Sequence, residues 1–147
     1  MPQLTAYLSF DGNCAEAMRF YEQALNGKLS VLLTNGQAPV GDRMPPGNED
    51  RIMHARLDLD GGAVLMAGDS LVGFGPPYQG MKGFTVTLSY DTAAEGKAAF
   101  DALSEGARNL LMPWGESFWA DGFGMLTDRY GTPWIVNGGM RTGWETK

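Results

Sequence analysis

The stretch Leu8-Ser9-Phe10-Asp11 decides the fold of this chain, because it recurs eighty residues later as Leu88-Ser89-Tyr90-Asp91. Each copy precedes a run in which apolar residues have helical spacing, and Phe20 and Phe100 take the same place in the two runs. A supersecondary unit that occurs twice predicts two copies that bury apolar surface together. A seam between two like modules is also a natural place for a small-molecule pocket.

The residues around the first copy predict a βαβββ module. Apolar alternation and helical spacing predict strands and one helix, and the turn-forming pairs Asn26-Gly27 and Gly61-Gly62 separate them. The expected strands cover 5–10, 29–34, 52–59 and 63–68, and the expected helix covers 15–25.

The second copy opens a module of the same order. The expected strands cover 84–90, 109–112, 117–127 and 133–137, and the expected helix covers 93–106. Asp128-Arg129-Tyr130-Gly131 predicts a turn before the last strand. The predicted fold class is α+β, with two paired βαβββ modules that form a curved mixed sheet around a cleft. We expect a single domain that consists of module one (1–72), a linker (73–82) and module two (83–147).

Composition bounds the class of protein. The chain has 147 residues, 44% of them hydrophobic and 19% charged, which is ordinary for one soluble domain. The net charge of −6 argues against a nucleic-acid partner or an anionic membrane, because few basic groups can neutralise phosphates. With Cys14 as the only cysteine and an N-terminus unlike a signal peptide, we expect a cytoplasmic protein.

Strand alternation assigns side chains to two faces of each predicted sheet. The helices should cover the apolar face, which holds Ala6, Leu8, Phe10, Met53, Leu57, Val86, Leu88 and Tyr90. The opposite face should hold Thr5, Tyr7, Ser9, His54, Arg56, Asp58, Thr85, Thr87 and Ser89. A mostly polar inner face predicts a solvent-accessible binding trough.

Four groups of residues allow a functional and a structural interpretation. His54 is either a general base or a hydrogen-bonded strand histidine, and Cys14 is either a reactive thiol or a small buried side chain. The segments 42–43 and 48–51 belong either to a solvated loop or to a lid. The aromatic stretch forms either a pocket wall or part of the core. Trp134 is assigned to the core, and either role is possible for Trp114, Phe118, Trp119 and Phe123.

Three motifs carry a resemblance to a known family. They are Phe10-Asp-Gly-Asn-Cys-Ala-Glu-Ala-Met-Arg-Phe-Tyr21, Met53-His-Ala-Arg-Leu57, and Trp114-Gly-Glu-Ser-Phe-Trp119 with Phe123-Gly124, Asp128 to Gly131 and Trp134. Together they resemble the vicinal oxygen chelate superfamily, which includes glyoxalase I, extradiol dioxygenases and bleomycin-resistance proteins. Within it the chain is most similar to the PhnB-like branch.

The resemblance implies a divalent metal held by four inward side chains from the first and last strands of each module. By strand position these fall at Thr5, Met66, Thr85 and Ile135, where the superfamily's enzymes normally carry His, Gln or Glu. A hydroxyl, a thioether and an aliphatic chain cannot replace those ligands for a hard divalent ion. We therefore expect no metal at this site and no cofactor.

The expected function is a glyoxalase/bleomycin-resistance-like protein that binds a small molecule without the usual four metal ligands, with metal-independent chemistry at His54. One alternative is a metal-dependent lyase or dioxygenase whose ligands are His54, Asp58 and a carboxylate of a partner chain. Another is a sequestering protein without catalysis. The resemblance also implies a homodimer. The expected ligand-binding residues are Thr5, Tyr7, Arg56, Asp58, Met66, Thr85, Thr87, Trp114, Trp119 and Ile135.

Overall fold

The computed structural model describes residues 1–39 and 44–145. The chain divides into two compact units, Met1–Gly80 and Met81–Lys147, and each is described by itself. The division falls inside the stretch 73–82 that the sequence predicts as a linker. Most of that stretch belongs to the first unit, where the Tyr78 hydroxyl donates a hydrogen bond to the carbonyl oxygen of Ser9 at 2.6 Å.

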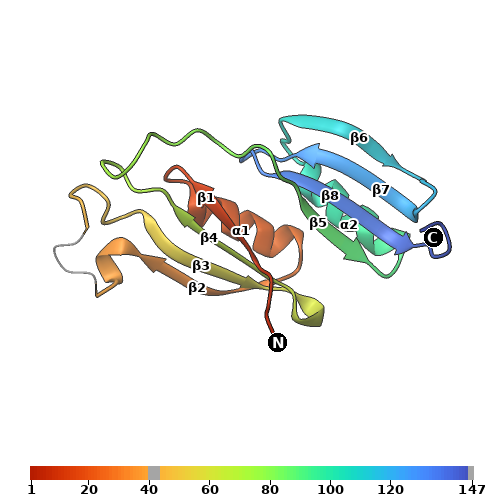
Figure 1. Ribbon diagram of the computed structural model, residues 1–147, viewed down its shortest axis with the longest axis horizontal. Helices are drawn as coiled ribbons and strands as arrows, with labels where there is room; N and C mark the ends of the chain where they lie inside the picture. Colours follow the sequence, from red (N-terminus) through yellow and green to blue (C-terminus); the bar gives the residue numbers. More distant parts are fainter. Residues whose placement is uncertain (40–43, 146–147) are drawn as a thin grey trace. The chain divides into compact units, whose positions relative to one another are not determined.

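The first unit is a four-stranded mixed sheet with one helix on one face (Figure 1). Its strand order is β1-β4-β3-β2, in which β1 runs parallel to β4 and the other pairs are antiparallel. A short 3-10 turn, η3 (Asp60–Gly62), takes the place of the two-residue turn predicted between β3 and β4. The main elements are β1 (Ala6–Phe10), α1 (Cys14–Ala24), β2 (Lys28–Thr34), β3 (Ile52–Asp58) and β4 (Val64–Asp69).

The second unit repeats this topology, which confirms the predicted duplication. Its strand order is β5-β8-β7-β6, and β5 again runs parallel to the last strand. The strand registers match as well: the pair Tyr7–Met66 in the first unit corresponds to the pair Thr87–Ile135 in the second. The elements are β5 (Val86–Tyr90), α2 (Ala93–Ser104), β6 (Asn109–Gly115), β7 (Ala120–Thr127) and β8 (Pro133–Met140).

Each helix covers one face of its own sheet with the apolar residues of its helical repeat. In α1 the buried residues are Cys14, Ala17, Met18 and Tyr21, and in α2 they are Gly96, Ala99, Phe100 and Leu103. Both helices are short, at 11 and 12 residues. In the part of the chain that the structure describes, no helix has both the length and the apolar character needed to cross a bilayer.

A break in the alternation of β3 corrects the predicted faces. In a regular strand, residues three apart face opposite sides, yet Ile52 is 4% exposed and Ala55 is fully buried. The pairing with β2 shifts register between these two residues. Such a bulge inserts one extra residue and turns it outward. Met53 is therefore 38% exposed and does not lie under the helix as predicted.

Other predictions fail at the ends of strands. Ala6 is exposed because it begins β1, which is an edge strand of its sheet. Strand β5 starts only at Val86, so Thr85 precedes it and lies exposed. In the second half β6 and β8 run further than predicted, to Gly115 and Met140, whereas β7 begins only at Ala120.

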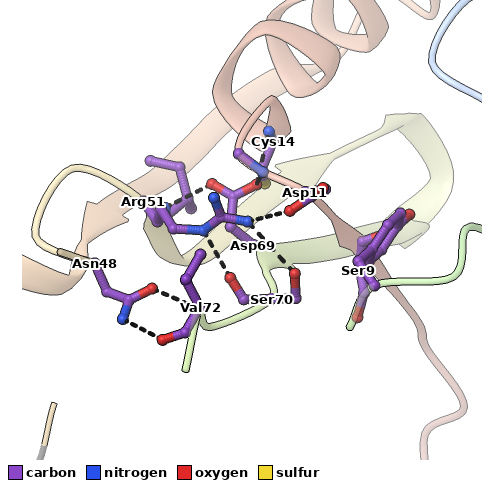
Figure 2. Close-up of polar contacts among 11 residues, drawn as sticks. Ser9, Asp11, Cys14, Asn48, Arg51, Asp69, Ser70 and Val72 are labelled. Carbon is purple, nitrogen blue, oxygen red and sulfur yellow. Dashed lines mark hydrogen bonds and ion pairs between the residues drawn. The ribbon is translucent and has the colours of Figure 1, made fainter. Parts of the chain in front are cut away.

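The Asp69 carboxylate fastens α1 to the sheet. It accepts backbone N–H hydrogen bonds from Gly12 at 2.8 Å and Cys14 at 3.0 Å through one oxygen, and from Ile52 at 2.7 Å through the other (Figure 2). A carboxylate at this place complements the partial positive charge of a helix N-terminus. The sequence does not reveal this contact, because Asp69 and Cys14 are far apart in the chain.

The segment 44–51 is tied to the same end of the sheet, as Figure 2 shows. Asn48 is fully buried, and its side chain bonds both the N–H and the carbonyl of Val72 at 2.8 and 3.0 Å. Arg51 donates to the Ser70 carbonyl at 2.7 Å and to the Asp11 carboxylate at 2.6 Å. Asn48 and Arg51 are thus structural contacts, whereas positions 42 and 43 of the predicted loop or lid lie outside the described residues.

Candidate functional site

The sheet face opposite α1, here called the first open face, gathers most of the site residues predicted in module one. The register places Tyr7, Met66 and Arg56 in one row across β1, β4 and β3. Thr5 precedes β1 and is half-buried. The first open face includes Tyr7, Ser9, His54, Arg56, Asp58, Met66 and Gly68, and the strand pairing adds Val31, Leu33 and Val64 beside them.

Tyr7 holds the His54 ring on this face. The two rings stack with centroids 5.7 Å apart and planes inclined by 16°. The Tyr7 hydroxyl lies 3.2 Å from His54 Nδ1 and donates to the Met53 carbonyl oxygen at 3.1 Å. A Cβ at Gly68 would come within 3.0 Å of that hydroxyl and 2.9 Å of that carbonyl, so a glycine is required beneath the contact.

These hydrogen bonds favour one tautomer of His54. A tyrosine hydroxyl has one proton, so when Tyr7 donates it to the Met53 carbonyl, Nδ1 of His54 is the donor in the contact between the two side chains. Burial, and then the charge of Cys14, raise the pKa of Tyr7 above its ordinary value, which keeps that proton in place. Nε2 is then the nitrogen that carries the lone pair.

Arg56 and Asp58 form an ion pair on the same face. Arg56 Nε lies 2.9 Å from Asp58 Oδ1, and their side chains are 42% and 38% exposed. Hydrogen bonds from Ser30 and then from Arg56 hold the pKa of Asp58 below its ordinary value, so its carboxylate stays ionised at neutral pH. Among the described residues the two terminal guanidinium nitrogens of Arg56 form no hydrogen bond, so they can donate to an anion.

The face opposite α2, here called the second open face, is mostly apolar at the matching positions. Thr87 pairs with Ile135, and Met125 takes the place that Arg56 has in the first unit. Phe123 is 8% exposed, because the Trp119 ring covers it with a centroid distance of 4.7 Å. The predicted residues that lie on this face are therefore Thr87, Trp119 and Ile135.

Trp114 does not lie on the second open face. A Cβ at Gly122 would lie 2.2 Å from its indole, and a Cβ at Gly96 of α2 would lie 2.9 Å from it. The indole thus packs between sheet and helix, also against Phe100 at 5.5 Å, and its predicted role in a pocket wall is not supported. Trp134 is 1% exposed, which confirms its assignment to the core.

The four positions that the resemblance assigns to metal ligands do not fit a divalent ion. Thr5 and Thr85 offer neutral hydroxyls, Met66 a thioether and Ile135 no donor atom. Within residues 1–39 and 44–145, no three His, Cys, Asp or Glu side chains are grouped so that they could hold a metal.

Cys14 is not placed for thiol chemistry. Its side chain is fully buried in the core, and burial, followed by the charge of Asp69, raises its pKa to about 12. The thiol is therefore neutral at physiological pH, and a neutral thiol is a poor nucleophile. The buried structural interpretation of Cys14 fits this environment.

Known proteins resemble this chain over nearly its whole length. The family model described as 3-demethylubiquinone-9 3-methyltransferase matches residues 2–137. The chain belongs to this family. Protein YjdN of Escherichia coli K12 is 34% identical, with 91% of this chain and 93% of that protein covered.

Solved structures agree with the family and with the fold. The crystal structure of protein PA1353 from Pseudomonas aeruginosa is 44% identical, covers 93% of this chain and 97% of its own, and superposes with a TM-score of 0.83. A PhnB protein from Bacillus cereus is 26% identical, with coverages of 92% and 98% and a TM-score of 0.70. The third structure is a glyoxylase/bleomycin resistance protein/dioxygenase domain from Frankia sp. EAN1pec. It is 15% identical, covers 94% of this chain and 98% of its own, and has a TM-score of 0.64, so it shows the fold alone.

These comparisons confirm the predicted superfamily and the glyoxalase/bleomycin-resistance fold. The family rests on the matching family model and on the relatives of 26% to 44% identity, whereas the Frankia domain supports the fold only.

The family's description names a methyl transfer, which requires a methyl donor. Nucleotide-type cofactors often place an anionic group at a helix N-terminus. Here the N-terminus of α1 is bonded to Asp69, and that of α2 is closed by a capping box between Thr92 and Glu95. At α1, two of the N–H groups that could bind an anionic group are thus already bonded to Asp69.

Proposed function

We propose that the first open face binds a small anionic ligand through Arg56 and that His54 exchanges a proton with it. The observation that carries this proposal is the placement of both side chains on the same side of β3, two residues and thus about 7 Å apart. Each has one polar group fixed by a neighbour, Asp58 or Tyr7, and another group free to meet a ligand. A site that is ordered before binding loses less entropy when the ligand arrives.

The chemistry of this site needs only the chain's own groups. The guanidinium of Arg56 holds a carboxylate or another anionic oxygen through its two terminal nitrogens. The neutral Nε2 of His54 accepts a proton from a hydroxyl or an acidic C–H of the bound ligand and can return it. Tyr7 orients the imidazole and retains its own proton.

Titration with oxalate, a small flat dianion, tests the proposal. Arg56→Gln should weaken binding tenfold or more, because a hydrogen bond to a charged group contributes about 1.5–3 kcal/mol. Arg19→Gln on the exposed side of α1 changes the net charge equally and should leave the affinity within about twofold. Equal losses in the two variants, or no loss in either, would refute the proposed role of Arg56.

The sequestering alternative differs in its dependence on His54. A protein that only stores its ligand should keep its affinity within about 1 kcal/mol in His54→Ala, and the wild type should turn over no bound ligand. For the metal-dependent alternative, Asp58 is already engaged by Arg56, so it could bind an ion only after that pair had separated.

Thr85, Thr87, Trp119 and Ile135 are further proposed ligand contacts, on or beside the second open face. We also propose a cytoplasmic homodimer, whose mass in solution would be twice the 15.9 kDa of one chain. That both open faces enclose one cleft stays a prediction.

A further inference from the structure

Asn137 is a nearly buried polar residue on the second open face, and neither the motifs nor the resemblance points to it. It is 5% exposed and lies two residues after Ile135 on β8, so both side chains are on the same face of the sheet. Its strand neighbours are Ser89 on β5 and Phe123 on β7. In the first unit the matching position is Gly68, which pairs with Ser9 as Asn137 pairs with Ser89, so the side chain is particular to the second unit.

Trp119 fixes the orientation of the Asn137 amide. The indole Nε1–H donates to Asn137 Oδ1 at 3.0 Å, and because an indole nitrogen can only donate, the oxygen must face it. The Nδ2 group then points the other way, and no hydrogen bond joins it to any described residue. Among the described residues no side-chain nitrogen or oxygen that is sealed from solvent lacks a partner, so this donor reaches solvent.

Aromatic rings frame this donor. Trp119 meets Phe123 edge to face with centroids 4.7 Å apart, and Phe118 meets Trp119 in the same manner at 4.8 Å. Phe118 is 66% exposed, so flat apolar surface is open to a ligand. Such surfaces favour planar ring systems.

The charges beside this frame favour a neutral ligand. Arg141 is the cation next to Trp119, since its backbone N–H donates to the Trp119 carbonyl at 2.7 Å. Its guanidinium already forms ion pairs with both Glu116 and Asp121. A free carboxylate on the ligand would therefore find no unpaired positive charge in this group of residues, whereas a carbonyl needs only the amide donor.

We propose that Asn137 and Trp119, whose ring packs on Phe123, form a binding site for a flat, neutral ligand that presents a carbonyl oxygen to Asn137 Nδ2. This proposal rests on the proposed function, namely that the open faces bind small molecules, and adds the ligand chemistry of the second face. The ligand needs a carbonyl because the Asn137 amide N–H is nearly buried. A ligand without an acceptor would displace water from this N–H and leave it without a hydrogen-bond partner.

Two probes that differ only at the carbonyl test this site. Chromone is a flat bicyclic ketone, and 4H-chromene carries a CH₂ group in its place. The readout is the indole N–H resonance of Trp119, which is identified by its absence from the spectrum of Trp119→Phe. Chromone should shift this resonance saturably and bind roughly tenfold more tightly than 4H-chromene, as expected for one hydrogen bond.

Asn137→Asp provides the matched variant. Its carboxylate still accepts the Trp119 N–H but has no N–H to donate, so the Trp119 N–H should remain hydrogen-bonded while the preference for chromone disappears. Equal affinity of the wild type for both probes, an undiminished preference in Asn137→Asp, or no binding of chromone up to its solubility limit would each overturn the proposal. The oxalate titration reports on Arg56 in the first unit, so a failure there and a failure here are seen separately.

Discussion

At the residue scale, the contact between Tyr7 and His54 is the feature that gives the first open face a defined chemistry. The sequence indicates that both side chains share a face, but it does not show that they touch, because the bulge at Met53 and the glycine at position 68 create the contact. A glycine inside a strand often marks such a close approach, and Gly68 is the signal that could have revealed it.

Tyr7→Phe tests the tautomer assigned to His54. In the wild type the ring proton should reside on Nδ1, where it meets the Tyr7 oxygen, and the variant should lose this preference because no oxygen remains there. Nitrogen-15 spectra of the imidazole report the tautomer directly, and the signal is unambiguous because His54 is the only histidine. A wild-type ring that is protonated on Nε2 would contradict the assignment.

Cys14 should make stability fall at high pH. Its pKa is 9.0 when unperturbed and about 12 in the folded protein. The neutral thiol therefore stabilises the fold fully below pH 9, and this contribution is lost as the pH rises from 9 toward 12, where the unfolded chain ionises first.

Urea unfolding at several pH values measures this effect. Cys14→Ala should flatten the decline in the free energy of unfolding over that range, because the variant has no thiol to titrate. An unchanged slope in Cys14→Ala would show that other groups cause the decline.

At the element scale, the sequence predicted the existence and order of the eight strands and two α-helices that the structure describes, and it failed mainly at their ends. Alternation identifies a strand from its own residues, and helical spacing does the same for a helix. The end of a strand depends on its neighbour, and the bulge in β3 depends on the pairing with β2. Contacts such as Asp69 with Cys14 arise only after folding, so no local pattern reveals them.

Asp69→Asn should destabilise the first unit. The carboxylate accepts three backbone N–H groups, and an amide oxygen with an N–H₂ beside it cannot replace both acceptor oxygens. We expect a loss of about 1–3 kcal/mol in the free energy of unfolding, measured with urea. The control is Asp91→Asn, an exposed carboxylate that follows β5, which should change it by less than about 0.5 kcal/mol. Similar small effects of both variants would show that Asp69 does not fasten the helix.

Gly122→Ala tests the packing of Trp114 in the second unit. The added Cβ would lie 2.2 Å from the indole, so the ring must move and the variant should lose about 1–3 kcal/mol in the free energy of unfolding. In Gly115→Ala the nearest atom would lie 3.9 Å away, so that variant should unfold at nearly the wild-type urea concentration. Equal stability of the two variants would contradict the assignment of Trp114 to the layer between sheet and helix.

At the scale of the whole molecule, the two units keep one topology while their open faces have diverged. Arg56 of the first unit corresponds to Met125 of the second, Tyr7 to Thr87 and Gly68 to Asn137. The sequence predicted the duplication from a short repeat but treated both inner faces as polar. The registers of paired strands were needed to show that the charged groups lie on the first face and the aromatic groups on the second.

The central proposal is that this chain binds an anionic ligand through Arg56, without a metal ion. Calorimetric titration of oxalate in a chelator-containing buffer, repeated on protein that was incubated with Mn²⁺ and then freed of unbound metal, tests this most directly. Saturable binding with chelator present, of similar affinity with Mn²⁺ and lost in Arg56→Gln, is the expected result. Binding that appears only with Mn²⁺, together with one metal ion per chain that disappears in His54→Ala, would contradict it.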